Sequence, residues 1–247
     1  MFILGTIWCR GGSKGIPGKN IKLLKGKPLI AYTIESALAS TFINDLIIST
    51  DDEAIAATAK QYGAKVPFMR PADLATDTAS KWPVFIHALE TYEQQTGTPV
   101  DYIVDMDVTV PLKTAADIDG AITMALSDTT IDVVITGYEP ERNPYFNMME
   151  QMPDGFFEIV KKGEKPIVRR QDAPLVYSLT PAAYIIKKSA LYAYEHWSKA
   201  KCKVYPIPRE RAIDIDTEID FSIVEFLMQH NKWINPIYSI LPIVLQL

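Results

Sequence analysis

Near its N-terminus the sequence reads Cys9-Arg10-Gly11-Gly12-Ser13-Lys14-Gly15-Ile16-Pro17-Gly18-Lys19-Asn20, directly after the apolar run Phe2-Ile3-Leu4-Gly5-Thr6-Ile7-Trp8. The apolar run predicts a buried strand, which opens into a loop with four glycines. Glycine lets backbone N–H groups approach an anion closely, because no Cβ holds the anion away. The stretch therefore predicts a phosphate-binding loop after the first strand.

A plain turn is the alternative interpretation of this loop, since Gly and Pro after a strand most often mark a turn. However, Arg10, Lys14 and Lys19 all lie within the glycine cluster, and a bound anion would relieve their mutual repulsion. The pattern lacks the Gly-Lys-Ser/Thr ending of the Walker loop and differs from the Gly-x-Gly-x-x-Gly dinucleotide fingerprint. We therefore expect a third kind of phosphate loop.

The composition favours a globular protein that binds a small anion. The 247 residues, 48% hydrophobic and 22% charged, can bury a sizeable core, and the formal net charge of −5 argues against a nucleic-acid partner. Two cysteines form neither a disulfide framework nor a zinc motif, so we expect them to be reduced in the cytoplasm. We expect no signal peptide and no membrane span, because the N-terminal apolar run and the apolar tail 233–247 are both too short. That tail is expected to pack on the domain or on a partner subunit.

Strands and helices alternate along the chain after the loop. Helices are predicted at 28–39, 53–62, 82–95, 115–126, 190–197 and from 217 onward, and strands at 45–50, 65–69, 101–110, 132–138, 182–186 and 203–207. Pro67 puts the strand at 65–69 at a sheet edge. This rhythm predicts an α/β fold with a mostly parallel sheet that binds ligands at the carboxyl ends of its strands. Frequent Pro and Gly at 139–174 predict a small antiparallel arm.

Two pairs of aspartates are candidates for binding a cation. Asp105 and Asp107 share a face if the strand at 101–110 is regular, and like charges on one face are costly unless they are hydrogen-bonded, protonated or neutralised. Asp214 and Asp216 form a second such pair. As an alternative, Asp105 caps the helix that begins near Thr114, and Asp216 caps the last helix.

Four motifs together resemble those of the acylneuraminate cytidylyltransferase family, the CMP-sialic acid synthetases and their relatives that act on other nonulosonic acids. These motifs are Arg-Gly-Gly-Ser-Lys-Gly-Ile-Pro-Gly-Lys-Asn at 10–20, Arg-Pro-Ala-Asp-Leu-Ala-Thr-Asp-Thr-Ala-Ser at 70–80, Arg-Arg-Gln at 169–171 and Asp-Ile-Asp-Thr-Glu at 214–218. The loop differs from that of the Kdo-activating relatives, which have Ser-Thr-Arg-Leu-Pro-Gly-Lys there. The resemblance spans about residues 1–230.

The resemblance implies a Rossmann-like nucleotidyltransferase core at 1–138 and 175–232, with a dimerisation arm at 139–174 that builds a homodimer and approaches the neighbouring site. Two segments depart from the family. The family usually reads Gln-Pro-Thr-Ser-Pro-Leu-Arg where this chain has Asp107-Val-Thr-Val-Pro-Leu-Lys113, and Asn-Gly-Ala-Ile-Tyr-Ile where it has Thr180-Pro-Ala-Ala-Tyr-Ile185. Both segments bear on the acceptor pocket, so CTP use is expected to be retained, and the identity of the acceptor is left open by these segments.

The resemblance also implies roles for individual residues. Nucleotide binding is expected from Arg10, Gly11, Gly12, Ser13, Lys14, Lys19, Asn20, Arg70 and Ser80, with Arg10, Lys14, Lys19 and Asp216 acting in catalysis. Acceptor binding is expected from Asp107, Lys113, Arg169, Arg170, Gln171 and Thr180, and Mg²⁺ binding from Asp107, Asp214 and Asp216. Surface ion pairs are the alternative role for the two arm arginines.

The implied reaction is attack of an acceptor oxygen on the α-phosphate of CTP, with release of pyrophosphate. The acceptor is expected to be a nonulosonic acid, that is, a sialic-acid-like 2-keto sugar acid. Two alternatives remain open at this point. The enzyme could transfer CMP to another small acid such as a phosphonate, or the chain could be a nucleotide-binding homologue that has lost turnover.

Overall fold

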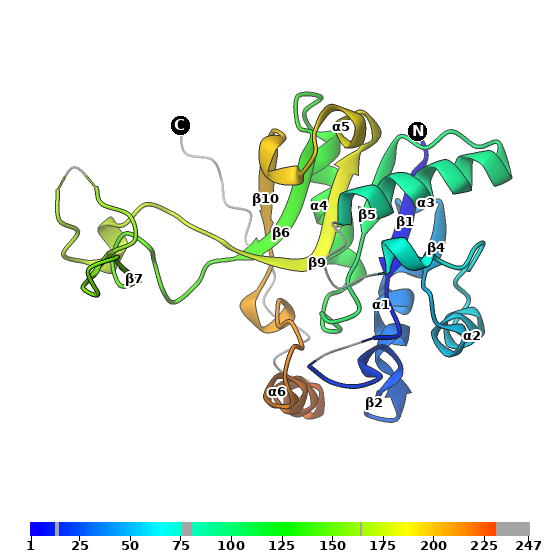
Figure 1. The fold of residues 1–247 in the computed structure, drawn as a ribbon, viewed down its shortest axis with the longest axis horizontal. Coiled ribbons are helices and arrows are strands. Elements are labelled where there is room, and N and C mark those ends of the chain that lie inside the picture. The colour runs from blue at the N-terminus through cyan, green and yellow to red at the C-terminus, as the bar shows by residue number, and fades with distance from the viewer. Residues whose placement is uncertain (13–14, 76–80, 164, 231–247) are drawn as a thin grey trace.

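A six-stranded sheet forms the centre of the computed structural model, which describes residues 1–12, 15–75, 81–163 and 165–230 (Figure 1). The sheet has the order β10-β6-β9-β5-β1-β4. Its strands are β1 (Ile3–Trp8), β4 (Asp45–Ser49), β5 (Tyr102–Asp105), β6 (Val133–Tyr138), β9 (Ser178–Lys187) and β10 (Cys202–Pro206). Strand β1 is parallel to β4 and β5, and β6 is parallel to β10, whereas β9 runs antiparallel between β5 and β6. The predicted α/β fold with a mostly parallel sheet is confirmed.

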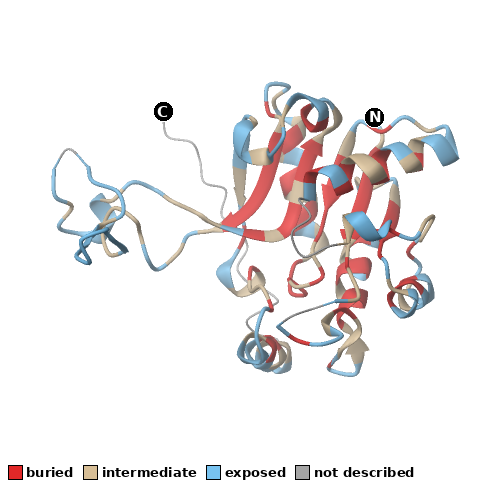
Figure 2. Cartoon of the chain, in the orientation of Figure 1, coloured by how far each residue is buried: buried red, intermediate tan, exposed pale blue. Residues whose placement is uncertain are grey.

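Helices cover both faces of the sheet, as the alternation of side chains along the strands requires. The helices α1 (Leu29–Leu38), α2 (Glu53–Gln61), α4 (Ala115–Leu126) and α6 (Glu218–Gln229) contribute to one buried apolar cluster, while α3 (Lys81–Thr96) and α5 (Lys188–Ala193) contribute to a second. Along β1, Ile3 and Ile7 belong to the first cluster and Leu4 to the second. Figure 2 shows the strands as the most deeply buried part of the chain.

Short elements complete the core. A hairpin of β2 (Leu23–Leu24) and β3 (Lys27–Pro28) was not predicted, and it turns at Gly26, whose φ of 80° lies in the left-handed region. Turns of 3-10 helix lie at Lys19–Ile21, Ala72–Leu74, Arg170–Asp172, Trp197–Lys199 and Arg209–Arg211. Among the described helices, none has the length and apolar character needed to cross a bilayer.

Three predicted elements differ from the structure. The strand predicted at 101–110 ends at Asp105, and the apolar residues after it form a buried loop whose backbone is bonded to neighbours: the Asp107 N–H donates to the Pro181 carbonyl at 3.0 Å. The predicted strand at 65–69 makes only two isolated parallel bridges beside β4, because Pro67 between them has no N–H. The helix predicted at 190–197 ends at Ala193.

An arm leaves the sheet between β6 and β9 and projects away from the core (Figure 1). It carries a hairpin of β7 (Met149–Gln151) and β8 (Phe157–Ile159), as the sequence predicted. Several of its large apolar side chains are exposed, among them Met149, Phe156, Phe157 and Val168. The arm therefore presents an apolar surface that the described residues of its own chain do not cover.

Candidate active site

The predicted phosphate loop begins where β1 ends, at the carboxyl end of that strand. The Cys9 N–H donates to the Ser49 carbonyl of β4 at 3.2 Å, which continues the sheet pairing by one residue. Asn20 Nδ2 donates to the Arg10 carbonyl at 2.9 Å and so closes the base of the loop. The glycine at position 18 has a φ of 63°, a conformation that other residues rarely adopt.

Two glycines of the loop lie against neighbouring aspartates. A Cβ on Gly15 would collide with the carbonyl oxygen of Asp216, and a Cβ on Gly11 would lie 2.7 Å from Oδ2 of Asp52. The Gly11 N–H donates to Oδ1 of Asp51 at 3.0 Å. The loop therefore packs closely against both the start of α2 and the segment that leads into α6, and glycine is required at both contacts.

A mainly polar cleft of about 430 Å³ opens beside this loop. It brings together three segments that are distant in sequence: the loop, the residues after β5 and the residues before α6. Its lining residues are Trp8, Cys9, Arg10, Gly12, Gly15, Lys19, Asn20, Asp107, Thr109 and Asp216. The structure thus places loop cations and two of the three predicted metal ligands in one cleft.

Lys19 and Asp216 form the contact between the loop and α6. Lys19 Nζ donates to the Ile215 carbonyl at 2.6 Å and lies 3.4 Å from Asp216 Oδ1. Asp216 does not cap α6, in contrast to the alternative considered above, because Thr217 is the N-cap and forms a capping box with Asp220. The Asp216 side chain, 74% exposed, therefore remains free to take a ligand.

The predicted set of three metal-binding carboxylates is only partly assembled. Asp107 and Asp216 line the cleft, but Asp214 is not among its lining residues. No group of three or more acidic, His or Cys side chains close enough to hold a metal occurs among the described residues. Within the part of the chain that the structure describes, Asp214 Oδ1 is buried without a hydrogen-bond partner, and burial raises the pKa of this carboxyl. Two carboxylates facing a polar cleft fit Mg²⁺, which binds few protein ligands when phosphates complete its shell.

Asp105 and Asp107 both approach the ammonium group of Lys81, the first residue of α3. Lys81 Nζ lies 3.2 Å from Asp107 Oδ2 and 3.7 Å from Asp105 Oδ2. Burial raises the pKa of Asp105 to about 7, although Lys81 opposes this shift. Burial also acts to raise the pKa of Asp107, but Lys81 and the Thr109 N–H outweigh it and hold that pKa below its usual value.

Asp105 does not cap α4, in contrast to the alternative considered above. Thr114 is the N-cap of that helix, and it forms a capping box with Asp117. Asp105 is 1% exposed, and neither of its carboxylate oxygens has a hydrogen-bond partner among the described residues. Its charge is therefore balanced by ion pairing alone.

Lys113 lies in the core and does not face the cleft. Its Nζ donates to Thr33 Oγ1 at 2.7 Å, to the Asp107 carbonyl at 2.6 Å and to the Val110 carbonyl at 2.8 Å. These three bonds use all the protons of the ammonium group, and burial lowers its pKa to about 7. The structure thus gives Lys113 a role in fixing the loop after β5, which differs from the predicted contact with the acceptor.

Thr180 is also buried, although the sequence placed it in the acceptor pocket. Its Oγ1 donates to the Ala212 carbonyl at 3.0 Å, and its carbonyl accepts a bond from Thr136 Oγ1 at 2.8 Å. The next residue, Pro181, offers its carbonyl to the Asp107 N–H. This segment therefore supports Asp107 through the backbone, and the Thr180 side chain does not reach the cleft.

Arg70 is buried against the end of β4. Its Nε donates to Ser49 Oγ at 3.1 Å, its Nη2 donates to the Ser49 carbonyl, and its guanidinium lies 5.6 Å from the ring centroid of Trp8. Trp8 lines the cleft, so Arg70 lies behind one of its walls.

Four predictions concern residues outside those that the structure describes. They are the roles of Ser13, Lys14 and Ser80 and the packing of the tail 233–247.

The three arm residues predicted to bind the acceptor are not near the cleft of their own chain. Arg169 forms an ion pair with Asp172 at 2.8 Å, and Arg170 Nη2 donates to the Pro140 carbonyl at 3.0 Å. Arg170 and Gln171 line a separate cavity of about 260 Å³ on the arm. Because the arm projects away from the core, these residues can meet such a cleft only on another chain (Figure 1).

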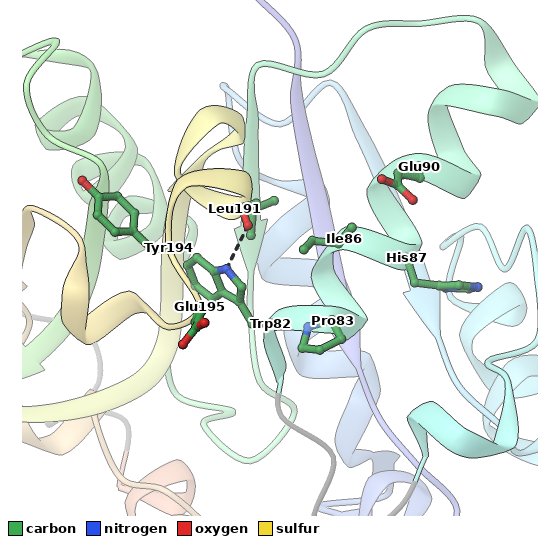
Figure 3. Close-up of a pocket in the computed structure, with 8 residues that line it drawn as sticks. All are labelled: Trp82, Pro83, Ile86, His87, Glu90, Leu191, Tyr194 and Glu195. Carbon is green, nitrogen blue, oxygen red and sulfur yellow. Dashed lines mark hydrogen bonds between the residues drawn. The ribbon is translucent and has the colours of Figure 1, made fainter.

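A second cleft, of about 580 Å³, lies between α3 and α5 and is mainly apolar (Figure 3). Trp82, whose Nε1 donates to the Leu191 carbonyl at 3.0 Å, lines it together with Ile86. None of the phosphate-loop residues lines this cleft. It therefore offers nothing that would bind a polyphosphate.

Sequence reasoning missed two residues of the site, Lys81 and Thr109. Lys81 directly follows the segment 70–80, and a cation was expected near Asp105 and Asp107 on electrostatic grounds, but the sequence does not say which element supplies it. Thr109 lies in the run that was predicted to be a strand; in the structure its N–H and hydroxyl donate to Asp107 Oδ1 at 3.2 and 3.1 Å.

Comparison with known proteins adds to this geometry. The profile of a family described as Cytidylyltransferase matches residues 4–233. The chain is 38% identical over 230 residues to post-translational flagellin modification protein B of Campylobacter coli, covering 93% of this chain and 96% of that protein. It is 37% identical over 226 residues to a CMP-N,N'-diacetyllegionaminic acid synthase of Campylobacter jejuni, covering 92% and 94%. A solved CMP:2-keto-3-deoxy-manno-octonic acid synthetase complexed with CTP superposes with a TM-score of 0.68 at 16% identity, covering 94% of this chain and all of that one, which shows a shared fold.

Proposed function

Because the chain belongs to the cytidylyltransferase family, whose members are CTP-dependent nucleotidyltransferases, we propose that it transfers CMP from CTP to a nonulosonic acid and releases pyrophosphate. A relative that aligns over nearly its whole length is named a CMP-N,N'-diacetyllegionaminic acid synthase, which supports an acceptor of this class. The free cysteines and the use of CTP are consistent with a cytoplasmic enzyme.

The observation that carries the proposal is the polar cleft in which the glycine loop faces Asp107 and Asp216. The N–H groups of Gly12 and Gly15, with Arg10 and Lys19, would bind the β- and γ-phosphates of CTP. Asp107 and Asp216 line the same cleft, where they can hold a cation against the phosphates. The cleft thus offers groups for both an anion and a metal.

Asp107 and Asp216 would hold Mg²⁺ in this cleft. When bound, Mg²⁺ supplies charge neutralisation at the phosphates and lowers the pKa of the acceptor hydroxyl. The protein holds each carboxylate differently. Asp107 is oriented by Thr109 and Lys81, whereas Asp216 is exposed and lies 3.4 Å from Lys19 Nζ.

In the reaction, the acceptor hydroxyl oxygen forms a bond to the α-phosphorus of CTP. The bond from that phosphorus to the bridging oxygen of the β-phosphate breaks, pyrophosphate leaves with the bridging oxygen, and the hydroxyl proton passes to solvent. Lys19 and Arg10 would stabilise the charge that develops on pyrophosphate. The Ile215 carbonyl holds the Lys19 ammonium beside Asp216, so this cation is positioned before the substrate binds.

The acceptor carboxylate needs a cationic partner, and the proposed source is the arm of a second chain. Lys113 is already fully bonded in the core, so Arg169 and Arg170 are the remaining candidates among those predicted. The exposed Phe156 and Phe157 of the arm would lie in the interface of a homodimer. Each arm would then contribute to the neighbouring cleft.

The test is a pyrophosphate-release assay with purified protein, Mg²⁺ and CTP, against a panel of nonulosonic acids and phosphonates. We expect release with a nonulosonic acid, with CTP preferred over ATP, GTP and UTP. Release with a phosphonate only would change the acceptor class. Binding of CTP without release for any acceptor would instead indicate a nucleotide-binding protein without turnover.

A further inference from the structure

We propose that Lys81 is a positioning residue, whose ammonium group holds the Asp107 carboxylate against the wall of the cleft and joins the start of α3 to the end of β5. The inference rests on the proposed function, because the orientation of Asp107 matters for turnover only if Asp107 acts in the cleft. The contact between Lys81 and Asp107 exists in the protein without ligands. It can therefore be tested separately from the proposed function.

Lys81 contacts groups from two different elements around the cleft. Its Nζ lies 3.2 Å from Asp107 Oδ2 and 3.7 Å from Asp105 Oδ2, and it lies 5.7 Å from the ring centroid of Tyr184 in β9. A cation over an aromatic face is attracted to it. The first residue of α3 is thus attached to the end of β5 and to β9 at the edge of the cleft.

The two carboxylate oxygens of Asp107 accept hydrogen bonds from different residues. Oδ1 accepts bonds from the Thr109 N–H and hydroxyl, and Oδ2 accepts a bond from Lys81. A carboxylate bonded at both oxygens has one orientation, which is what a metal or substrate contact requires. Removal of Lys81 would take away the bond to Oδ2 and leave the carboxylate held through Oδ1 and Thr109.

Lys81 has a second partner, Asp105, and this partner suggests the competing explanation. Asp105 is 1% exposed, and no other side chain among the described residues is within ion-pair distance of it. Loss of Lys81 would leave Asp105 buried without its ion-pair partner, so this carboxyl would have to take up a proton or stay as an uncompensated charge, and either costs stability. A merely structural role for Lys81 would therefore act through Asp105, and a positioning role acts through Asp107.

The position of Lys81 in the sequence is a further reason to expect a role in the site. The segment 70–80, which resembles the nucleotide-contacting segment of the family, ends one residue before it. Lys81, the first residue of α3, thus follows directly on this segment in the chain and contacts Asp107.

The experiment compares Lys81→Met, Lys81→Arg and the double variant Lys81→Met/Asp105→Asn with the wild type. The measurements are kcat and KM for CTP, the melting temperature, the affinity for Mg²⁺ and CTP by calorimetry, and a crystal structure of the double variant. Lys65→Met is the matched control, because Lys65 pairs with Asp45 at 2.6 Å on the far side of β4 and is not in the cleft.

The expected result for Lys81→Met is a lower melting temperature and a loss of roughly 10- to 100-fold in kcat, the effect of misplacing an active-site group by about 1 Å. Lys81→Arg should recover most of the rate. Neutralising Asp105 in the double variant should restore the melting temperature but not kcat, and the crystal structure should show Asp107 turned away from its position beside Thr109. Lys65→Met should have wild-type kinetics.

The proposal is overturned if the double variant recovers both its melting temperature and its rate, since Lys81 would then serve only to neutralise Asp105. It is also overturned if Asp107 keeps its orientation in the crystal structure of the double variant. Failure of the proposed function can be distinguished from failure of this proposal, because in the former case the wild type itself would release no pyrophosphate. In that case the crystal structure and calorimetry still decide the role of Lys81.

Discussion

The ion pair between Arg211 and Asp117 holds the segment before α6 against the start of α4, and its loss should be costly. Arg211 Nε and Nη2 donate to the two oxygens of Asp117 at 2.9 and 2.7 Å, and the side chains are 11% and 5% exposed. Asp117 also accepts bonds from the Thr114 N–H and hydroxyl as part of the α4 capping box. We predict that Arg211→Met is strongly destabilising.

The size of the expected loss in unfolding free energy follows from the burial of the ion pair. Removing one partner of a buried pair leaves the other charge uncompensated and costs about 3–5 kcal/mol. The comparison is Arg209→Met, two residues earlier, because Arg209 pairs with Glu141 while the two side chains are 58% and 62% exposed. An exposed pair contributes about 0–1 kcal/mol, so this control should unfold almost like the wild type.

The assay is equilibrium unfolding in urea, followed by tryptophan fluorescence, for the wild type and both variants. The double variant Arg211→Met/Asp117→Asn should recover part of the loss, because it removes the stranded charge. If Arg211→Met and Arg209→Met had the same unfolding free energy within about 1 kcal/mol, the reasoning about this buried pair would be refuted.

Two further predictions concern the cleft and the arm. Lys19→Met should reduce kcat/KM for CTP by about 10²- to 10³-fold in the pyrophosphate assay, because it removes a positioned cation at the leaving group, and a loss below tenfold would contradict this role. Phe157→Asp, at a side chain 56% exposed on the arm hairpin, should shift the protein from dimer to monomer in analytical ultracentrifugation with an unchanged melting temperature. A wild type that sediments as a monomer would refute the dimer.

The sequence was sufficient to predict the alternating elements and a glycine-rich loop at the carboxyl end of the first strand, because apolar periodicity and glycine-rich loops have local causes. Prediction from the sequence failed where the local conformation depends on contacts with residues far away in the chain. The run at 101–110 is apolar enough for a strand, but its second half is a buried loop stabilised by contacts with Pro181 and Lys113. The alternative capping roles of Asp105 and Asp216 are not borne out, because Thr114 and Thr217 each have an aspartate three residues later and form capping boxes with it.

The segments 107–113 and 180–185, which were expected to form the acceptor pocket, show more clearly that the sequence does not predict where a side chain points. Lys113 and Thr180 were placed in the acceptor pocket by resemblance, yet both are buried and bonded to backbone carbonyls. Conversely, Lys81 was not predicted, because its role depends on α3 lying beside the end of β5. Sequence position identifies a segment of the site, whereas the direction of each side chain is set by its packing.

The proposed reaction passes CMP from CTP to a nonulosonic acid. The most direct measurement is mass spectrometry of the products formed by the wild-type protein from CTP, Mg²⁺ and N,N'-diacetyllegionaminic acid, with pyrophosphate quantified in parallel. We expect a product with the mass of the acid plus CMP minus water, formed in a one-to-one ratio with pyrophosphate. Absence of that product for this acid and for all other nonulosonic acids offered, while CTP remains intact, would contradict it.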